Sequence, residues 1–432
     1  MGAMIYPLTS LLLGIGLMLA GIGLLFPVLG LRAAAAQFPV WVTGIVMSAY
    51  FAGFMLGTFV CPAIIRRVGH IRAFAAMASV ASTMPILHAL AVNPWAWGCF
   101  RLVTGMCIVG LYIVIESWLN AVAPNDKRGK IFAIYMAVTL IAMAVGQFLI
   151  LVGDQLGFVP FALASVLLSI ALVPVTLTRV AEPKPVPAPR LGLRNLYATS
   201  PLGVVGATVS GLLNGAFFGM GAVFAQRVGF SDAGIATFMG ATILGGAALQ
   251  WPIGHYSDRR DRRRVMFWVC AIGATLAAAG VFVSHWSEPG LIVIAFLYGG
   301  FVFTVYGLSV AHVNDLIDSS RLLEVTGGLL LLYGVGAAIG PTAAGLLMNA
   351  LGPGSLMTYF ATLLCLTAIF AAHRLRVAPP VPVDARSDYV TMAGSSQAVL
   401  QLDPRTEAVP VAEPDRDLQA GAHARAMRQG TR

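Results

Sequence analysis

Twelve long apolar segments divide the first 374 residues of the chain. Each is about 20 residues long, which is the length that an α-helix needs to cross the hydrocarbon core of a bilayer. Inside these segments and clear of their ends, only Arg101 and Glu116 carry a formal charge. Because that core offers no water to backbone polar groups, the pattern restricts the chain to membrane-spanning helices. The expected spans are 7–29, 40–63, 73–92, 95–121, 130–152, 158–178, 200–224, 233–253, 265–284, 290–313, 325–348 and 354–374.

The composition excludes several classes of protein. Charged residues make up 10% of the 432 residues and the mean hydropathy is +0.83, whereas soluble domains average about 25% charged residues. A soluble enzyme, a coiled coil and a disordered chain are therefore excluded. The five cysteines form no CxxC pair and no His/Cys cluster with metal-ligand spacing, and no segment has the form of a nucleotide-binding loop. We expect neither a cofactor nor a resident metal.

The net charge of +9 lies in the short loops between the apolar segments. Sixteen Lys and Arg residues occupy the loops that follow even-numbered spans, and only Arg32 and Arg227 occupy the opposite loops. This asymmetry is typical of the positive-inside bias of membrane proteins rather than of nucleic-acid binding, and it predicts that both termini are cytoplasmic. An excess of 24 Arg over 3 Lys in an Ala- and Gly-rich chain indicates a GC-rich bacterium. We expect a multi-pass protein of the bacterial inner membrane.

A Pro-rich connection separates six spans from the next six. It defines four expected regions: an N-terminal six-helix bundle at 1–178, a cytoplasmic linker at 179–199, a C-terminal six-helix bundle at 200–374 and a cytoplasmic tail at 375–432. The linker is expected to be extended because of its prolines. The tail has no apolar periodicity, so we expect it to be disordered and dispensable for transport.

The two halves contain an internal repeat. Tyr112, Asn120 and Gly146 recur 194 residues later as Tyr306, Asn314 and Gly340, and the basic loop 66–72 recurs at 258–264. Matched points in register indicate a duplicated unit. The predicted fold is therefore an all-α membrane protein with twelve transmembrane helices in two pseudo-symmetric six-helix bundles, a design used by transporters.

Short motifs in two basic loops and on three spans make the chain similar to a known family. The loop after span 8 has the form G-x-x-x-D-R-x-x-R-R, and the loop after span 2 keeps Arg67, Gly69 and Arg72. Span 4 carries an R-x-x-x-G motif, span 5 opens with an Arg-Gly pair, and span 11 carries G-x-x-x-G-P. With these motifs the chain resembles the major facilitator superfamily, and the segment "ESWLN" resembles an uncharacterised bacterial branch of it. The resemblance implies a secondary transporter. The motif residues are Gly254, Asp258, Arg259, Arg262 and Arg263 after span 8, Arg101 and Gly105 on span 4, Arg128 and Gly129 on span 5, and Gly336, Gly340 and Pro341 on span 11.

Span 4 contains the strongest candidates for a transport path. At 100° per residue its polar residues share a stripe about 100° wide, and ionisable groups inside a membrane are functional hypotheses by default. Arg101 is expected to attract an anionic group, or else to extend to the interface. Glu116 is expected to exchange protons, or else to pair with a basic loop residue such as Arg66 or Arg67. The full set of path candidates is Arg101, Tyr112, Glu116, Asn120, Gln147, Asn214 and Asn314.

Several of these candidates have a structural alternative. Asn120 and Asn314 fit helix C-terminal residues, and Gln147 and Asn214 fit interhelical hydrogen bonds. Aromatic residues such as Tyr50, Tyr135 and Tyr333 are interpreted as packing or interface residues.

The basic loops are candidates for a gate. An acid followed by clustered arginines can join neighbouring helix ends by charge-assisted bonds, and bonds made in only one access state bias alternating access. The alternative is a plain topology signal, which would not require Asp258. The gating candidates are Arg67, Gly69, Arg72, Gly254, Asp258, Arg259, Arg262 and Arg263.

The sequence therefore predicts a secondary active transporter that moves a small organic solute by alternating access. We expect protons as the coupling ion, the lipid bilayer and a small molecule as partners, no nucleic acid, and a monomer. A facilitative uniporter and a non-transporting sensor or scaffold remain alternatives. An intramembrane enzyme is disfavoured because the two buried charged groups form no nucleophile–base pair.

Overall fold

The computed structural model describes residues 2–124, 127–177, 193–284, 286–317 and 321–377, together with eight residues of the tail: Pro382, Arg386, Tyr389, Val390, Thr391, Ser396, Ala398 and Val399. Twelve helices in these ranges are long and apolar enough to cross a membrane. They confirm the twelve predicted spans. Most of the predicted linker, residues 179–192, lies outside the described residues.

The first six spans are formed by helices α1 to α7. Their bounds are α1 Gly2–Ala35, α2 Val40–Val68, α3 His70–Leu90, α4 Pro94–Val122, α5 Arg128–Phe148 with the 3-10 helix η2 Leu149–Leu151, α6 Val159–Ile170 and α7 Leu172–Thr176. Local signals set several boundaries. The Asn93 side chain caps α4 by accepting from two backbone N–H groups of its first turn, as an N-cap residue does. Gly69 joins α2 to α3 at φ +84°, a conformation that favours glycine.

The second six spans are formed by helices α9 to α15, preceded by the short helix α8 Leu193–Thr199. The tenth span is broken at Phe303 into two helices. The carbonyl oxygen of Phe303 accepts a hydrogen bond from the Gln250 side chain at 3.2 Å, which satisfies a backbone group that the break releases. The bounds are α9 Pro201–Arg227, α10 Asp232–Asp258, α11 Arg262–Val283, α12 Glu288–Val302, α13 Thr304–Asn314, α14 Leu322–Leu351 and α15 Ser355–Val377.

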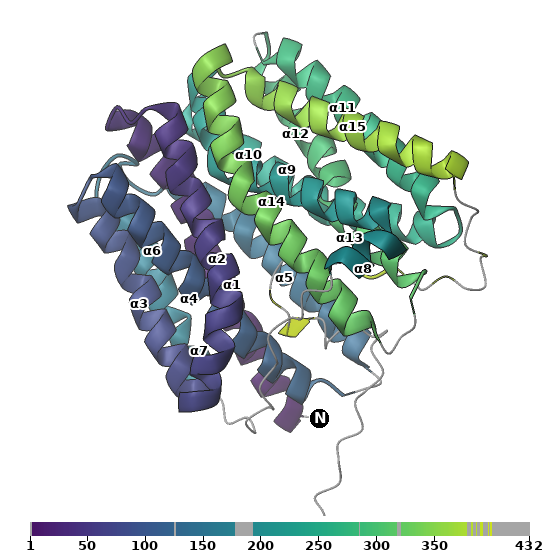
Figure 1. Cartoon of the computed structure of the whole chain (residues 1–432). Coiled ribbons are helices and arrows are strands. Elements are labelled where there is room, and N and C mark those ends of the chain that lie inside the picture. The colour runs from purple at the N-terminus through teal and green to yellow at the C-terminus, as the bar shows by residue number, and fades with distance from the viewer. Residues whose placement is uncertain are drawn as a thin grey trace, which may run out of the picture.

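We call α1–α7 the first set of helices and α9–α15 the second set. Matching pairs pack within each set, and α2 also packs on α14 and α5 on α10 across the two sets (Figure 1). The first span packs on the fifth, the second on the fourth and the third on the sixth. This matched pairing agrees with the predicted internal repeat. We call the end that carries loops 66–72 and 259–264 the basic end; the N-terminus of α1 and the C-terminus of α15 also lie there.

Contacts across the two sets gather at the end opposite the basic end. The Ser48 hydroxyl of α2 lies 2.7 Å from the Thr342 hydroxyl of α14. The Phe148 ring of α5 lies against Gly240 of α10, and Val223 of α9 lies against Gly30 of α1. In Figure 1 the two sets diverge from these contacts toward the basic end. The structure is thus joined at one end of the helices and splayed at the other.

Two glycines bring the backbones of α2 and α4 into direct contact. A Cβ added to Gly105 would lie 1.9 Å from the Tyr50 carbonyl oxygen, and one added to Gly53 would lie 1.9 Å from the Leu102 carbonyl oxygen. The second half repeats this crossing: Gly245 meets Phe296 and Gly299 meets Thr242 in the same way. Small residues at such crossings are what let membrane helices pack closely. The crossing also fixes Arg101 beside Tyr50.

The described residues of the tail contact both sets of helices. The Tyr389 backbone N–H donates to Asp258 at the end of α10 at 2.8 Å. The Ser396 hydroxyl donates to Glu116 of α4, and Val399 is buried. At these positions the tail therefore differs from the expected disordered segment; the rest of that prediction lies outside the described residues.

We predict that Gly105→Ala destabilises the protein, because the added methyl group must displace the α2 backbone. Overpacking of this kind costs about 1–3 kcal/mol or more. Gly98→Ala is the matched control on the same helix, since no atom of the described residues lies within 4 Å of its added Cβ, and alanine there favours the helix by about 1 kcal/mol. Thermal unfolding of the purified variants measures both effects. Equal melting temperatures for the two variants would contradict the close crossing.

Candidate functional site

A cavity of about 110 Å³ lies between the two sets of helices. The first set contributes α1, α2, α4 and α5, and the second contributes α9 and α14. Its walls are mostly aromatic and aliphatic, and four lining residues carry hydroxyl groups: Tyr50, Thr58, Tyr112 and Tyr333. A concave, largely apolar site with few polar groups is the usual form of a small-molecule site. The other lining residues are Phe26, Phe51, Phe54, Met55, Met143, Phe218, Leu330, Leu331, Gly334 and Ala337.

Arg101 lies directly behind two rings of this cavity. Its guanidinium carbon is 4.4 Å from the Tyr50 ring centroid and 4.5 Å from the Phe26 ring centroid, and the residue has no exposed surface. Within the described part of the chain, none of its three side-chain nitrogens has a hydrogen-bond partner. Arg101 therefore does not extend to the interface, which was the structural alternative for this residue.

The two ring contacts of Arg101 offset the cost of burying its charge, but they do not satisfy its hydrogen-bond donors. A charge at this depth costs at least ~2.5 kcal/mol on insertion scales, and a desolvated cation–π contact offsets roughly 2 kcal/mol. Two rings can thus compensate the charge. Ring faces do not replace hydrogen-bond acceptors, however, and each buried unsatisfied donor costs about 1–3 kcal/mol. An anion or a water molecule beside Phe26 and Tyr50 would relieve that cost.

Glu116 lies 15 residues further along α4, which is about 22 Å nearer the basic end. Its side chain is fully buried. The Tyr135 hydroxyl of α5 donates to one carboxylate oxygen at 2.5 Å, and the Ser396 hydroxyl of the tail donates to the other. Buried carboxylates need such donors to remain charged. Arg101 and Glu116 are too far apart to pair, so they form two separate polar points on one helix.

The other path candidates divide into those near the cavity and those away from it. Tyr112 lines the cavity, and Asn214 lies at its wall with its amide nitrogen 3.4 Å from the Tyr333 hydroxyl. Gln147 instead donates to the Gly23 carbonyl oxygen of α1 at 2.8 Å, which is an interhelical hydrogen bond. Asn120 and Asn314 lie in the last turns of α4 and α13, toward the basic end.

The loop after α10 forms an ion-pair cluster. Arg262 Nε lies 2.6 Å from Asp315 Oδ2, and Arg262 Nη1 lies 3.3 Å from Asp258 Oδ1 and 2.9 Å from the Ser257 hydroxyl. The Arg262 and Asp315 side chains are only 1% and 2% exposed. This cluster joins the ends of α10, α11 and α13, so the structure brings together Asp258 and Arg262 as the motif indicated.

Arg263 makes a second pair beside this cluster. Its Nη2 lies 2.7 Å from Asp261 Oδ2, and its Nη1 donates to the Arg374 carbonyl oxygen at 3.2 Å. Burial raises the pKa of Asp261, but the hydrogen bonds and charge of Arg263 outweigh it, so that pKa lies below its usual value. The lowered pKa means that Asp261 stabilises the fold above its unfolded pKa, and this contribution is lost as the pH falls through the folded pKa.

The remaining gating candidates are not part of this cluster. Arg67, Arg72 and Arg259 are exposed. Gly254 lies under the Tyr389 ring, where a Cβ would clash. The first basic loop is therefore built differently from the second.

Sequence reasoning missed several residues that the structure places at these sites. Asp315 follows Asn314 directly, and an acid at a helix end facing a basic loop was an available signal. Tyr50 and Tyr333 line the cavity, and Tyr135 donates to Glu116, whereas the sequence favours packing or interface roles for these aromatic residues. Ser396 had no signal, since it lies 280 residues from Glu116.

Comparison with known proteins identifies the family. The model of the Major Facilitator Superfamily matches residues 11–322 and 203–399, so the chain belongs to that superfamily. The uncharacterized MFS-type transporter Ent638_1421 of Enterobacter sp. (strain 638) is 29% identical over 355 residues, which cover 79% of this chain and 89% of that protein. The uncharacterized MFS-type transporter YcaD of Salmonella typhimurium is 26% identical over 350 residues, with the same coverage.

The fold also matches a solved transporter. A crystal structure of the nucleoside transporter NupG, in a mutant form, superposes with a TM-score of 0.72 at 13% identity and covers 85% of this chain and 100% of that one. The protein is therefore a multi-pass membrane transporter, with a small-molecule substrate implied by its family.

We predict that Asp315→Asn destabilises the protein far more than Asp258→Asn. Removing one partner of a buried ion pair costs about 3–5 kcal/mol because the other charge stays buried. The Asp258 contact is longer and partly exposed, so its loss should cost about 1 kcal/mol or less. Glu324→Gln is the control, because Glu324 pairs with Arg321 at 3.8 Å on the exposed surface. Thermal unfolding of the three variants gives the order. A melting temperature for Asp315→Asn equal to that of Glu324→Gln would contradict the cluster.

Proposed function

We propose that this protein is a secondary active transporter that moves a small organic anion across the bacterial inner membrane by alternating access. The carrying observation is the fully buried Arg101 guanidinium, without a hydrogen-bond partner among the described residues, behind two rings of the cavity that both sets of helices line. An anionic group would supply the missing acceptors by charge-assisted hydrogen bonds. The aromatic and aliphatic walls suit an apolar body on the same solute.

The arrangement of the two sets of helices supports alternating access. Contacts join the sets at the end opposite the basic end, and the sets diverge toward the basic end (Figure 1). The positive-inside bias makes the basic end cytoplasmic, with both termini on that side. The described arrangement is then the inward-facing state. Rocking of one set on the other about the central cavity would expose the site to the other side.

Glu116 is the proposed proton site. It lies on the same helix as Arg101 but near the cytoplasmic end of the path, where a carboxylate can exchange protons with the cytoplasm. Protonation would remove its need for two hydroxyl donors and so weaken its bonds to Tyr135 and Ser396. This coupling separates the proposal from a facilitative uniporter, which would not accumulate solute, and from a sensor, which would bind solute without moving it.

We predict that Arg101→Ala weakens binding of anionic solutes selectively. A charged hydrogen bond contributes about 1.5–3 kcal/mol, so the affinity should fall roughly 10- to 100-fold. The assay is thermal stabilisation by aromatic carboxylates and by their primary amides, followed by flux of any hit in proteoliposomes. Arg101→Lys keeps the charge if the alanine variant fails to fold, and the exposed Arg227→Ala is the charge-matched control. Equal stabilisation of the wild type by acids and amides would refute the substrate class.

We predict that Glu116→Gln abolishes accumulation driven by a pH gradient but retains exchange of solute. Glutamine keeps the size of the side chain but cannot take up or release a proton. The measurement is uptake and counterflow of the identified solute in proteoliposomes with an imposed pH gradient. Accumulation with the wild-type pH dependence would place the coupling elsewhere or make the carrier a uniporter. Binding of solute with no flux in any condition would favour the sensor.

The tail contacts change the expectation that deleting the tail has no effect. Tyr389 is held by Asp258 of the second set, and Ser396 by Glu116 of the first set. Through the tail these bonds link the two sets, so we expect them to resist movement of one set relative to the other. We predict that truncation after Pro382 increases the rate of flux severalfold. Truncation after Val399 is the matched control, because it keeps both contacts and should transport as the wild type does. Slower flux in the variant that ends at Pro382 would contradict this role.

A further inference from the structure

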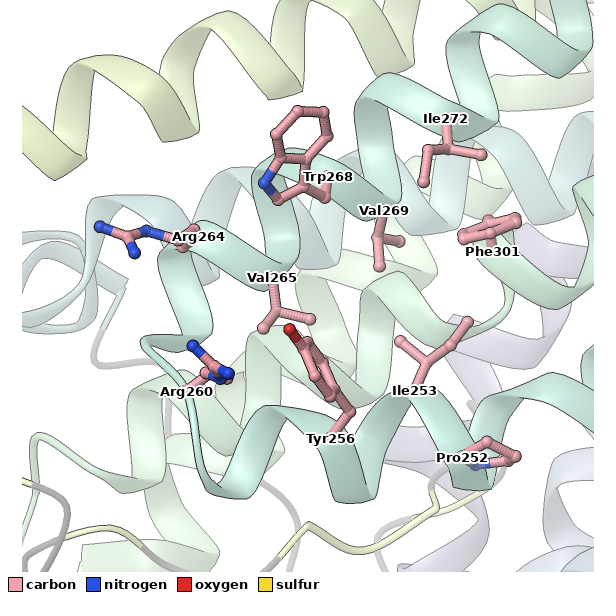
Figure 2. Close-up of a pocket in the computed structure, with 10 residues that line it drawn as sticks. All are labelled: Pro252, Ile253, Tyr256, Arg260, Arg264, Val265, Trp268, Val269, Ile272 and Phe301. Atoms are coloured by element: carbon pink, nitrogen blue, oxygen red, sulfur yellow. The ribbon is translucent and has the colours of Figure 1, made fainter.

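A second, larger cavity lies on the outer face of the second set of helices. This groove has a volume of about 340 Å³ between α10 and α11, with Phe301 of α12 as part of its floor (Figure 2). It lies at the basic end and is separate from the central cavity, with which it shares no lining residue. Because α10 and α11 cross the membrane, an outward-facing groove between them opens toward lipid.

The groove has a charged end and an apolar end. Figure 2 shows Arg260 and Arg264 together at one end, while Ile272 and Phe301 lie at the other. From Arg264 to Ile272 the groove follows α11 for eight residues, or about 12 Å. One leaflet of the hydrocarbon core is roughly 15 Å deep. The groove therefore has the polarity and length that suit a headgroup followed by an acyl chain.

Arg260 and Arg264 differ from the two arginines beside them. Arg262 and Arg263 are buried and paired with Asp315 and Asp261. Arg260 and Arg264 are exposed, and within the described ranges neither has a carboxylate partner. The Arg260 guanidinium lies 5.8 Å from the Tyr256 ring centroid, over the edge of the groove. The loop thus presents one pair of arginines to the ion-pair cluster and the other pair to the lipid side.

Aromatic residues on the groove fit the boundary between headgroups and acyl chains. Tyr256 is 59% exposed and Trp268 is 57% exposed, and both line the groove between its charged and apolar ends (Figure 2). Tyr and Trp are enriched at this depth of a membrane because one part of each ring is polar and the rest is apolar. Val265 and Val269 form the buried floor beneath them.

We propose that this groove is a binding site for an anionic phospholipid of the cytoplasmic leaflet. The negatively charged phosphate of the headgroup binds Arg260 and Arg264, and one acyl chain lies along Val265, Val269 and Ile272 against Trp268. Basic pockets between transmembrane helices on the cytoplasmic side are suited to such headgroups, and the two arginines, which have no carboxylate partner in the described part of the chain, supply the charge complementarity. This site is independent of the transported solute, because the groove and the central cavity are separate.

The test is native mass spectrometry of the delipidated full chain titrated with phosphatidylglycerol or with phosphatidylcholine of the same acyl chains. Wild-type protein should prefer phosphatidylglycerol. Each arginine near an anionic surface contributes about fivefold in affinity, so Arg260→Gln with Arg264→Gln should lower phosphatidylglycerol affinity by about 25-fold. Phosphatidylcholine affinity should fall much less, because the choline cation balances the charge of its phosphate. Trp268→Ala should weaken both lipids and keep their ratio.

A charge-matched control separates a built site from general attraction to the basic end. Arg66→Gln with Arg376→Gln removes two exposed arginines from the same end of the molecule but from other surfaces, and it should retain the preference for phosphatidylglycerol. The proposal is overturned if the Arg260 and Arg264 variant keeps that preference. It is equally overturned if the control variant loses as much of it, or if wild-type protein binds the two lipids alike.

Discussion

Direct backbone contact between helices, made possible by glycine, is the constraint on which the rest of this structure depends. Lipid tails are as apolar as helix side chains, so the hydrophobic effect does not draw membrane helices together and close packing must do so. Gly53 and Gly105 let α2 and α4 touch, and Gly245 and Gly299 do the same for α10 and α12. The internal repeat is thus also present in the packing, because corresponding glycines in the two halves face corresponding carbonyl oxygens.

The same crossing has different consequences in the two halves. In the first half it holds Arg101 against Tyr50, with Phe26 on the other side of the guanidinium. In the second half the corresponding position, one residue before Phe296, is Ala295, which is buried and uncharged. A duplicated scaffold therefore carries one charge at its centre. That charge lies beside a cavity that both halves line, and the proposed binding site depends on this placement.

The arginines of the loop after α10 have two different surroundings, because their side chains point in different directions. Consecutive residues on a helix end point around its axis, so a run of arginines cannot all face one partner. Arg262 and Arg263 turn inward and meet carboxylates, whereas Arg260 and Arg264 turn outward to the groove of α10 and α11. A run that satisfies the positive-inside bias as a whole thus also supplies an ion-pair cluster and two arginines that have no carboxylate partner among the described residues. Arg262, Arg263 and Arg264 point in different directions around the first turn of α11, whereas Arg260 lies in the turn before that helix.

The sequence by itself determined the twelve spans, the basic loops and the repeat, because each depends on local properties: apolar length, charge between spans and matched spacing. It also singled out Arg101 and Glu116, since a charge within an apolar segment stands out without any knowledge of neighbours. Only the tertiary structure decided what those charges meet. Phe26 and Tyr50 come from two other helices, Asp315 completes the Arg262 cluster from a third, and Ser396 reaches Glu116 across 280 residues of chain. Helical periodicity gives the face on which a side chain lies, but the partner on the opposite face is set by how helices cross, which here depends on contacts far apart in sequence.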